Sequence, residues 1–285
     1  MQRPKRVATI NDLSVFGRCA LSVITPVISV MGSQVLAIPT TVLSTHTGGF
    51  KNISSVNCDG FIDSLAKQYS EIGLDIDCIY SGYLANSSQF KSTNRFIDTF
   101  PNAFIVVDPV LGDSGKLYRG LTAEMVESMQ NLVSRADLIT PNPTEACFLT
   151  ETGFAENFSK NHAMDLILSL AQKSSANIII TGIDIAEIGK CNLCLSKSGR
   201  IFAVRCDVKN QSYHGTGDCF CATVVGSLMR GDSLESAVCN ATSFVEHCIE
   251  ITADSGEPER DGIFLESALP VLLYAGKNKK IIDMR

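Results

Sequence analysis

Short β-forming runs alternate with helix-like segments along most of this chain, and this alternation restricts the fold more than any other feature. The runs rich in apolar and β-branched residues are 6–10, 34–39, 78–82, 104–109, 137–140 and 177–181. The segments with apolar residues at helical spacing are 18–31, 57–70, 87–99, 122–134 and 161–173. Strands that alternate with helices pair in parallel and are covered on both faces. The sequence therefore predicts an α/β fold with a mostly parallel central sheet.

The later part of the chain departs from this alternation. Two β-forming runs, 190–196 and 200–206, are separated only by 197–199, which predicts an antiparallel hairpin at one edge of the sheet. The polar segment 253–262, ADSGEPERDG, is expected to form a surface loop near the last helix. A length of 285 residues would allow two domains, but no repeat, linker or low-complexity tract divides the chain. We therefore expect a single domain over 1–285.

Composition limits the class of protein. The hydrophobic content of 45% is enough for a large core, and the formal net charge of -6 argues against a basic nucleic-acid surface. The start, MQRPKRVATIND, lacks the apolar stretch of a signal peptide, and no later run reaches membrane-spanning length. We therefore expect small-molecule partners and a cytoplasmic location. The 11 cysteines are odd in number and lie mostly in apolar segments, so we interpret them as reduced core residues.

Polar residues gather where three of the predicted strands end. They are Asp108, Asp113 and Tyr118 after the first of these strands, Thr140, Asn142 and Glu145 after the second, and Thr181 and Gly182 at the third. In parallel sheets, binding sites form at the carboxyl ends of the strands. Carboxylate, amide and hydroxyl oxygens suit Mg²⁺, which keeps several waters and binds phosphates. Capping of turns and helices is the alternative for each residue taken singly.

The segment HGTGDCFC, 214–221, places three small or flexible residues directly before a helical pattern. Glycines at this position let backbone N–H groups converge on one anion, and the helix dipole adds positive potential. Gly215, Thr216 and Gly217 therefore predict a phosphoryl-binding turn. Asp218 follows it, and a carboxylate beside a phosphate cradle can accept the proton of an attacking hydroxyl. The alternative is that Asp218 only caps the helix.

The chain resembles the vitamin B6 kinases, the pyridoxal or pyridoxamine kinases of the ribokinase-like superfamily, over nearly its whole length. The segments that carry the resemblance are INDLSVFGRC, LSTHTGGF, SGYL, VVDPVLGDSGKLY, TPNPTEA and GTGD. GTGD specifies the superfamily, whereas LSTHTGG, SGYL and DPVLGD point to the vitamin B6 branch. The resemblance implies a three-layer sandwich, a homodimer, and ATP-dependent phosphorylation of a vitamer's hydroxymethyl group.

The resemblance also assigns roles to particular residues. It implies that Asp218 is the catalytic base and that Gly215, Thr216 and Gly217 form the anion hole. It places Asp108, Asp113 and Glu145 around Mg-ATP, and a monovalent cation such as K⁺ at Asp108, Thr140 and Thr181. Nucleotide contacts fall to Asp113, Tyr118, Asn142, Thr181 and Gly182. The residues implied for the ring pocket are Asp12, Leu43, His46, Thr47 and Tyr83. For His46, a hydrogen-bonded loop role is the equal alternative.

Three positions depart from the family pattern: Asp12 replaces a common serine, Phe16 a tyrosine or arginine, and Leu43 a phenylalanine. These changes bear on the substrate, so a hydroxymethylpyrimidine kinase remains the alternative function. A sugar kinase or a nucleotide-binding protein without catalysis fits the sequence less well. Asp12 is expected in a loop after the first strand. A carboxylate there would favour pyridoxamine over pyridoxal if it faces the ring, or it would merely cap the loop.

Overall fold

The computed structural model describes residues 3–207, 213–273, 279 and 281–284. The strands are β1 (Arg6–Phe16), β2 (Gln34–Thr45), β3 (Ser55–Asn57), β4 (Cys78–Ser81), β5 (Phe104–Val107), β6 (Gly112–Asp113), β7 (Lys116–Leu117), β8 (Leu138–Ile139), β9 (Asn177–Ile185), β10 (Gly189–Leu195), β11 (Ile201–Arg205) and β12 (Ile281–Asp283). The α-helices are α1 (Leu21–Val30), α2 (Phe61–Glu71), α3 (Ser87–Thr99), α4 (Ala123–Val133), α5 (Pro143–Thr150), α6 (Lys160–Lys173), α7 (Thr216–Arg230) and α8 (Leu234–Ser255). Two 3₁₀ turns follow, η1 (Glu259–Asp261) and η2 (Leu269–Leu273).

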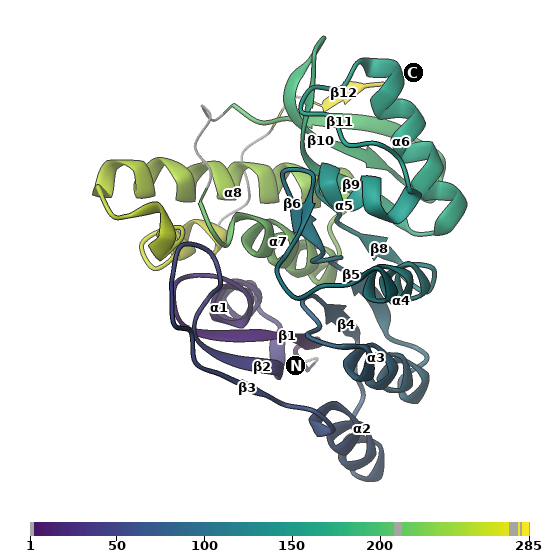
Figure 1. The fold of residues 1–285 in the computed structure, drawn as a ribbon, viewed down its shortest axis with the longest axis vertical. Coiled ribbons are helices and arrows are strands. Elements are labelled where there is room, and N and C mark those ends of the chain that lie inside the picture. Colours follow the sequence, from purple (N-terminus) through teal and green to yellow (C-terminus); the bar gives the residue numbers. More distant parts are fainter. Residues whose placement is uncertain (1–2, 208–212, 274–278, 280, 285) are drawn as a thin grey trace.

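One large sheet forms the centre of the molecule (Figure 1). Within the described residues its strand order is β12-β11-β10-β9-β8-β5-β4-β1-β2-β3, and β6 pairs only with β7. The strands from β9 through β8, β5, β4 and β1 to β2 pair in parallel. The hairpin β10–β11 and the strand β3 join this block in antiparallel pairing. The predicted mostly parallel sheet is confirmed.

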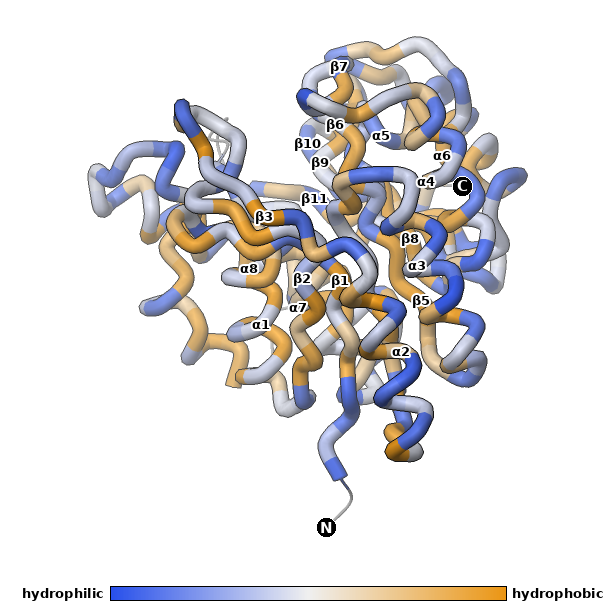
Figure 2. Tube along the Cα trace, turned by 60° about the horizontal axis from the view of Figure 1, so that its bottom comes forward, coloured by the Kyte–Doolittle hydropathy of each residue, from blue (hydrophilic) through white to orange (hydrophobic). Residues whose placement is uncertain are grey.

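Helices cover both faces of the sheet, because successive strand residues point to opposite sides. In β1, Ala8 and Ile10 pack into one apolar cluster, whereas Val7 packs into the other. The first cluster is closed by α2, α3, α4, α5 and α6, and the second by α1, α7 and α8. Figure 2 shows the hydrophobic stretches inside this arrangement and hydrophilic residues on outer turns of helices such as α2 and α3. The three-layer sandwich is therefore confirmed.

Most helix starts have a physical reason in the sequence. Side-chain oxygens of Asn86, Thr122, Ser159 and Ser233 accept backbone N–H groups in the first turns of α3, α4, α6 and α8. The eight-residue α5 was not predicted, although it begins with an asparagine cap followed by Pro143. Helix boundaries otherwise agree with the predicted segments to within a few residues.

Several strands differ from the prediction. β1, β2 and β9 run beyond their predicted ends, so residues expected in loops belong to strands. The predicted hairpin exists, but β12 pairs with β11, so the hairpin is not the edge of the sheet. The predicted surface loop 253–262 begins inside α8, which continues to Ser255. The cysteines are free thiols, and most of them are buried, as expected. In the part of the chain described, no helix has the length and apolar character needed to cross a bilayer.

Candidate active site

The glycine turn before α7 has the geometry of an anion-binding site. Gly215 is the N-cap of this 15-residue helix, and no side chain caps the helix start. Its φ of +85° favours glycine, and a Cβ atom there would collide with the carbonyl oxygen of Arg18. The Thr216 hydroxyl donates back to the Tyr213 carbonyl at 3.1 Å. Within the part of the chain that the structure describes, the first N–H groups of α7 thus have no side-chain acceptor.

Asp218 does not cap α7, because it lies within the first helical turn and its carboxylate is used elsewhere. Its Oδ2 accepts the backbone N–H of Ala20, at the start of α1, at 2.7 Å. Burial raises the pKa of Asp218 to about 6, although this hydrogen bond opposes the rise. At neutral pH the group is therefore mainly ionised and able to accept a proton. The capping interpretation of Asp218 is wrong.

Asp12 lies within β1, not in a loop after it, because β1 extends to Phe16. The β1–β2 register shifts between Asn11 and Leu13, and Asp12 sits at this irregularity, 8% exposed. Burial raises the pKa of Asp12 to about 7, and repulsion from Asp218 contributes, against a hydrogen bond from Ser14. The two carboxylates are therefore electrostatic neighbours.

Asn11 holds Asp12 and Tyr83 close to one another. Its Oδ1 accepts the backbone N–H of Asp12 at 2.9 Å and that of Tyr83 at 2.8 Å. Gly82 packs directly against the Asn11 amide, where a Cβ atom would collide. The Tyr83 side chain is half-buried, and burial together with the charge of Asp12 raises the pKa of its hydroxyl. Sequence reasoning missed Asn11; its signal is an amide inside an otherwise apolar strand.

The remaining ring-pocket candidates lie on β2 and the segment after it. Leu43 is half-buried in β2 beside Ser14 of β1, and Thr47 is exposed. His46 accepts the Gly48 N–H at Nδ1, at 3.1 Å, and its Nε2 lies 2.6 Å from the Arg260 carbonyl oxygen. These partners assign the proton to Nε2. Both ring nitrogens of His46 thus have partners within the protein, as expected for a hydrogen-bonded loop residue. A contact between His46 and the substrate stays a prediction.

Asp108 and Thr140 come together at the carboxyl ends of β5 and β8. The Thr140 hydroxyl donates to Asp108 Oδ1 at 3.1 Å, and the Tyr80 hydroxyl donates to Oδ2 at 3.2 Å. Burial raises the pKa of Asp108 to about 7, with a contribution from Asp218. Tyr80 is the second residue that sequence reasoning missed. Its signal is a tyrosine in the buried strand CIYS, whose hydroxyl needs a partner.

Glu145 and Asn142 form a capping box at the start of α5. Asn142 Oδ1 accepts the Glu145 N–H at 2.9 Å, and Glu145 Oε2 accepts the Asn142 N–H at 2.8 Å. Asn142 also donates to the Gly112 carbonyl at 2.8 Å, which fastens the β6–β7 hairpin to α5. Glu145 Oε1 accepts the Leu111 N–H at 3.2 Å. Asn142 and Glu145 thus cap α5, as the alternative interpretation of these two residues expected.

The hairpin carries the two exposed nucleotide-side candidates. Asp113 is exposed, and its Oδ1 accepts the N–H of Ser114 at 2.7 Å. Tyr118 is 40% exposed. Burial and the charges of Glu145 and Asp113 raise the pKa of its hydroxyl. The carboxylates of Asp108, Asp218 and Glu145 and this hydroxyl therefore belong to one electrostatic neighbourhood.

Thr181 and Gly182 were expected at a strand end, but they lie inside β9. The pairing of β9 with β10 shifts here, so that both residues face Asn192. Gly182 has a φ of +63° and donates its N–H to the Asn192 side chain at 2.9 Å. Thr181 donates its N–H to the Pro141 carbonyl at 2.9 Å. The bulge lies just after the part of β9 that pairs with β8.

The acidic side chains suit a divalent cation in chemistry but do not form a cage by themselves. In the described ranges, no three His, Cys, Asp or Glu side chains converge enough to hold a metal. Mg²⁺ commonly binds through one or two carboxylates, with waters and phosphates completing its shell. Burial and the charge of Asp108 raise the pKa of Glu145, and the donors to Asp108 within the described residues are the hydroxyls of Tyr80 and Thr140. Among the described residues, no Lys, Arg or His forms an ion pair with Asp108 or Glu145, so their oxygens suit Mg²⁺ bound together with phosphate.

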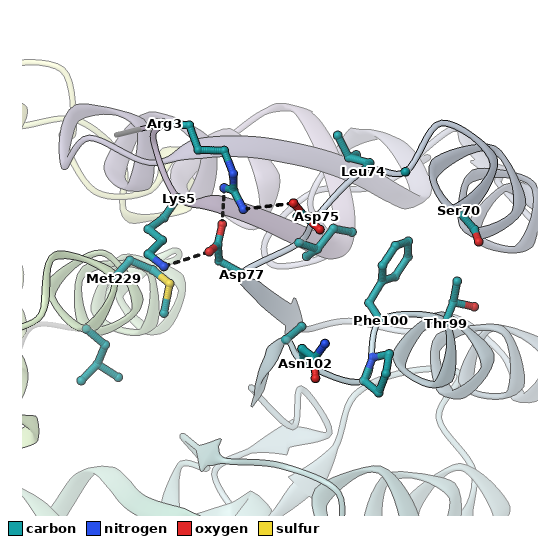
Figure 3. A pocket seen from close by; sticks show the side chains of 15 residues that line it. Arg3, Lys5, Ser70, Leu74, Asp75, Asp77, Thr99, Phe100, Asn102 and Met229 are labelled. Carbon is teal, nitrogen blue, oxygen red and sulfur yellow. Dashed lines mark hydrogen bonds and ion pairs between the residues drawn. The ribbon is translucent and has the colours of Figure 1, made fainter. Parts of the chain in front are cut away.

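A separate pocket of about 600 Å³ lies at the amino ends of the strands, away from these residues (Figure 3). Arg3 Nη1 and Lys5 Nζ line it and bind Asp77, at 2.5 Å and 2.9 Å. Although burial acts in the opposite direction, hydrogen bonds from the Arg6 N–H, Arg3 and Lys5 hold the pKa of Asp77 at about 2. Because its cations already have a partner, we do not assign the active site to this pocket.

Comparisons with known proteins agree with this geometry. The model of a family described as phosphomethylpyrimidine kinase matches residues 7–260. The pyridoxine/pyridoxal/pyridoxamine kinase of Bordetella avium is 27% identical over 90% of each chain. The pyridoxal kinase structure of Lactobacillus plantarum is 28% identical, with a TM-score of 0.87 and coverage of 94% of this chain and 96% of that one.

A protein of Bacteroides thetaiotaomicron, provisionally named a phosphomethylpyrimidine kinase and crystallised with pyridoxal, is 33% identical to this chain. Its structure superposes with a TM-score of 0.92 and covers 98% of this chain and 99% of its own. The predicted resemblance to vitamin B6 kinases is therefore confirmed. The proteins that it resembles include named kinases of vitamin B6. With the family model matching almost the whole sequence, this chain belongs to the phosphomethylpyrimidine kinase family.

Proposed function

We propose that this protein is a vitamin B6 kinase, which transfers the γ-phosphoryl group of ATP to the hydroxymethyl group of pyridoxal, pyridoxine or pyridoxamine. The observation that carries the proposal is the position of Asp218 in the first turn of α7, directly after the uncapped turn Gly215–Gly217. A proton acceptor and an anion-binding turn are therefore adjacent. Phosphoryl transfer to an alcohol needs this combination. Relatives named as kinases of pyridoxal, pyridoxine and pyridoxamine supply the substrate class.

In this mechanism Asp218 holds the hydroxymethyl group by accepting its hydrogen bond. As the hydroxymethyl oxygen bonds to the γ-phosphorus, the bond from that phosphorus to the bridging oxygen of ADP breaks. The hydroxyl proton passes to Asp218, and ADP leaves with the electron pair of the broken bond. The N–H groups of Thr216 and Gly217 stabilise the negative charge on the transferring group. The Ala20 N–H orients the carboxylate of Asp218 for this step.

Cations belong to the same proposal. Asp108 and Glu145 would hold Mg²⁺, with Asp113 nearby, and the ion would neutralise charge on the nucleotide phosphates. A monovalent ion such as K⁺ would bind near Asp108, Thr140 and Thr181. The close Asp108–Thr140 contact supports the first two ligands of that set. The proposed nucleotide contacts remain Asp113, Tyr118, Asn142, Thr181 and Gly182. The proposed ring contacts remain Asp12, Leu43, His46, Thr47 and Tyr83.

We further propose that the chain acts as a single kinase domain, in a homodimer, in the cytoplasm. The shared ten-stranded sheet of the described residues supports the single domain. Size-exclusion chromatography with light scattering tests the dimer, for which a mass near twice 30.7 kDa is expected. A monomer under assay conditions contradicts it.

Hydroxymethylpyrimidine is the alternative acceptor, because the matching family is described as phosphomethylpyrimidine kinase. The test is coupled ADP release with pyridoxal, pyridoxine, pyridoxamine, hydroxymethylpyrimidine and ribose, each over a range of concentrations. We expect the highest kcat/KM with a vitamin B6 vitamer. A hydroxymethylpyrimidine value above all three vitamers overturns the assignment. The Asp218→Asn variant, assayed in parallel, reports ATP hydrolysis by any contaminating enzyme.

A further inference from the structure

Asp12 is a buried carboxylate without a cationic partner. It is 8% exposed, and its Oδ2 accepts one hydrogen bond, from the Ser14 hydroxyl at 3.1 Å. Across the described ranges, no Lys, Arg or His pairs with it. A buried carboxylate is normally paired with a positive group or a strong donor, because water no longer solvates it. In the protein without substrate, the described residues therefore provide no positive partner for the Asp12 carboxylate.

The groups that face Asp12 make a negative charge on its carboxylate still less favourable. Asp218 repels it, and Cys19 and Tyr83 lie within reach of its charge. Burial, with the charges of Asp218 and Asp12, raises the pKa of the Cys19 thiol, so the thiol stays neutral. Arg6 and Arg18 are equally near to Asp12 along the chain, and both have other partners. Arg6 donates to Gln34 and to the Asp75 carbonyl. Arg18 uses its Nε on both oxygens of Glu266, at 3.0 Å each, and stacks over Phe264. The carboxylates of Asp12 and Asp218 are thus neighbours, and the guanidinium group of Arg18 binds Glu266 and not Asp12.

We propose that Asp12 is a specificity residue that binds a positively charged substituent of the substrate, next to the hydroxymethyl group that Asp218 activates. This inference rests on the proposed function. The substituent beside the reacting hydroxymethyl group is an ammonium in pyridoxamine, an aldehyde in pyridoxal and a hydroxymethyl in pyridoxine. Because Asp12 and Asp218 are neighbours, the substituent beside the reacting group faces Asp12. Pyridoxamine is then the preferred vitamer.

The half-buried Tyr83 supports this orientation. Asn11 fixes both the Asp12 N–H and the Tyr83 N–H, so the carboxylate and the aromatic ring have a fixed relation. A flat pyridine ring lying against Tyr83 presents its substituents around the ring edge to the two carboxylates. A charge-assisted hydrogen bond is stronger than a neutral one, whereas an aldehyde offers only an acceptor to the carboxylate. The contact therefore discriminates between substituents of similar size.

The cleanest comparison is between pyridoxamine and 4-deoxypyridoxine, which carries a methyl group in place of the aminomethyl group. Both keep the ring nitrogen, the phenolic hydroxyl and the reacting hydroxymethyl group. For the wild type we expect kcat/KM to favour pyridoxamine about 10- to 100-fold, the range for one hydrogen bond to a charged group. In Asp12→Ser and Asp12→Asn we expect the two values to lie within about threefold of each other. Asp165→Ser, which removes an exposed carboxylate of α6, serves as the matched control and should keep the wild-type ratio.

Calorimetric titration of each ligand, with a non-hydrolysable ATP analogue present, measures the same preference without turnover. Equal affinities of the wild type for the two ligands, or a preference that survives in both Asp12 variants, overturn the role of Asp12. Failure to phosphorylate any vitamer overturns the proposed function instead, so the two results are distinguishable. A variant that merely loosens the fold lowers both values together, and thermal unfolding of each variant detects it.

Discussion

Replacing Asp218 by asparagine tests the chemistry most sharply, because the structure predicts opposite effects on turnover and on stability. Asparagine keeps the shape of the side chain, and its carbonyl oxygen can still accept the Ala20 N–H. It cannot take the proton of the attacking hydroxyl. Loss of a general base lowers rates by about 10²- to 10⁴-fold, so we expect kcat to fall by that factor while the affinity for ATP changes little.

The stability effect follows from the raised pKa of Asp218. Burial moves it from 3.8 to about 6, so between these pH values the folded protein holds a proton that the unfolded chain has released. Raising the pH through this window therefore destabilises the wild type. A shift of this size corresponds to up to about 3 kcal/mol above pH 6. Asparagine has no such penalty, so the variant should be more stable than the wild type at pH 7.5 and nearly equal to it below about pH 4.

Two measurements check this prediction. Single-turnover kinetics with saturating ATP gives the rate of the chemical step, and urea unfolding at pH 4 and pH 7.5 gives the two stability differences. A variant that keeps more than about a tenth of the wild-type rate contradicts the role of Asp218 as base. If the variant is less stable than the wild type at pH 7.5, the burial of the ionised Asp218 carboxylate does not destabilise the fold, and the stability argument is wrong.

Further predictions concern pH, cations, the glycine turn and the capping box. Wild-type kcat/KM should fall below about pH 6 as Asp218 becomes protonated, and a flat profile down to pH 5 would argue against it. Chelation of divalent ions should abolish activity, and K⁺ should increase it over Na⁺; turnover without any divalent ion refutes the metal proposal. Gly215→Ala should lower the free energy of unfolding by about 1–3 kcal/mol, because Gly215 has a positive φ and a Cβ atom would collide with the Arg18 carbonyl. Gly217→Ala should change the free energy of unfolding by less than about 0.5 kcal/mol, because a Cβ atom there meets no other atom. Asn142→Ala should cost about 1 kcal/mol and raise the KM for ATP, since the hairpin loses its fastening to α5; an unchanged KM removes Asn142 from the nucleotide side.

Much of the scaffold could be predicted because its signals are local. Buried parallel strands are short apolar runs, and the helices between them have clear periodicity, so the elements and their mostly parallel pairing follow from the pattern. The order of the strands in the sheet does not, because β1 lies between β2 and β4. The extensions of β1 and β2 could not be predicted in this way. Residues such as Asp12 and Ser14 are polar, and they belong to a strand only because β2 runs beside them and supplies hydrogen bonds.

The site was predictable as a set of strand-end residues but not as a set of contacts. The sequence placed Asp108 and Thr140 near each other, and the structure adds the hydrogen bond between them and the Tyr80 hydroxyl. Partners from distant segments, such as Asn11 with Tyr83 or Ala20 with Asp218, depend on the tertiary fold. Thr181 and Gly182 were misplaced because a bulge shows no apolar break in the sequence, only a glycine.

Product identification in a competition reaction tests the central claim most directly. Equimolar pyridoxal, pyridoxine, pyridoxamine and hydroxymethylpyrimidine are incubated with the wild-type protein, ATP, Mg²⁺ and K⁺, and the early products are resolved by mass spectrometry. Because all acceptors compete for one site, the product ratios equal the ratios of kcat/KM. We expect vitamer 5′-phosphates to dominate, with one ADP formed for each. Hydroxymethylpyrimidine phosphate as the main product, or ADP without any phosphorylated vitamer, would contradict the assignment of this protein as a vitamin B6 kinase.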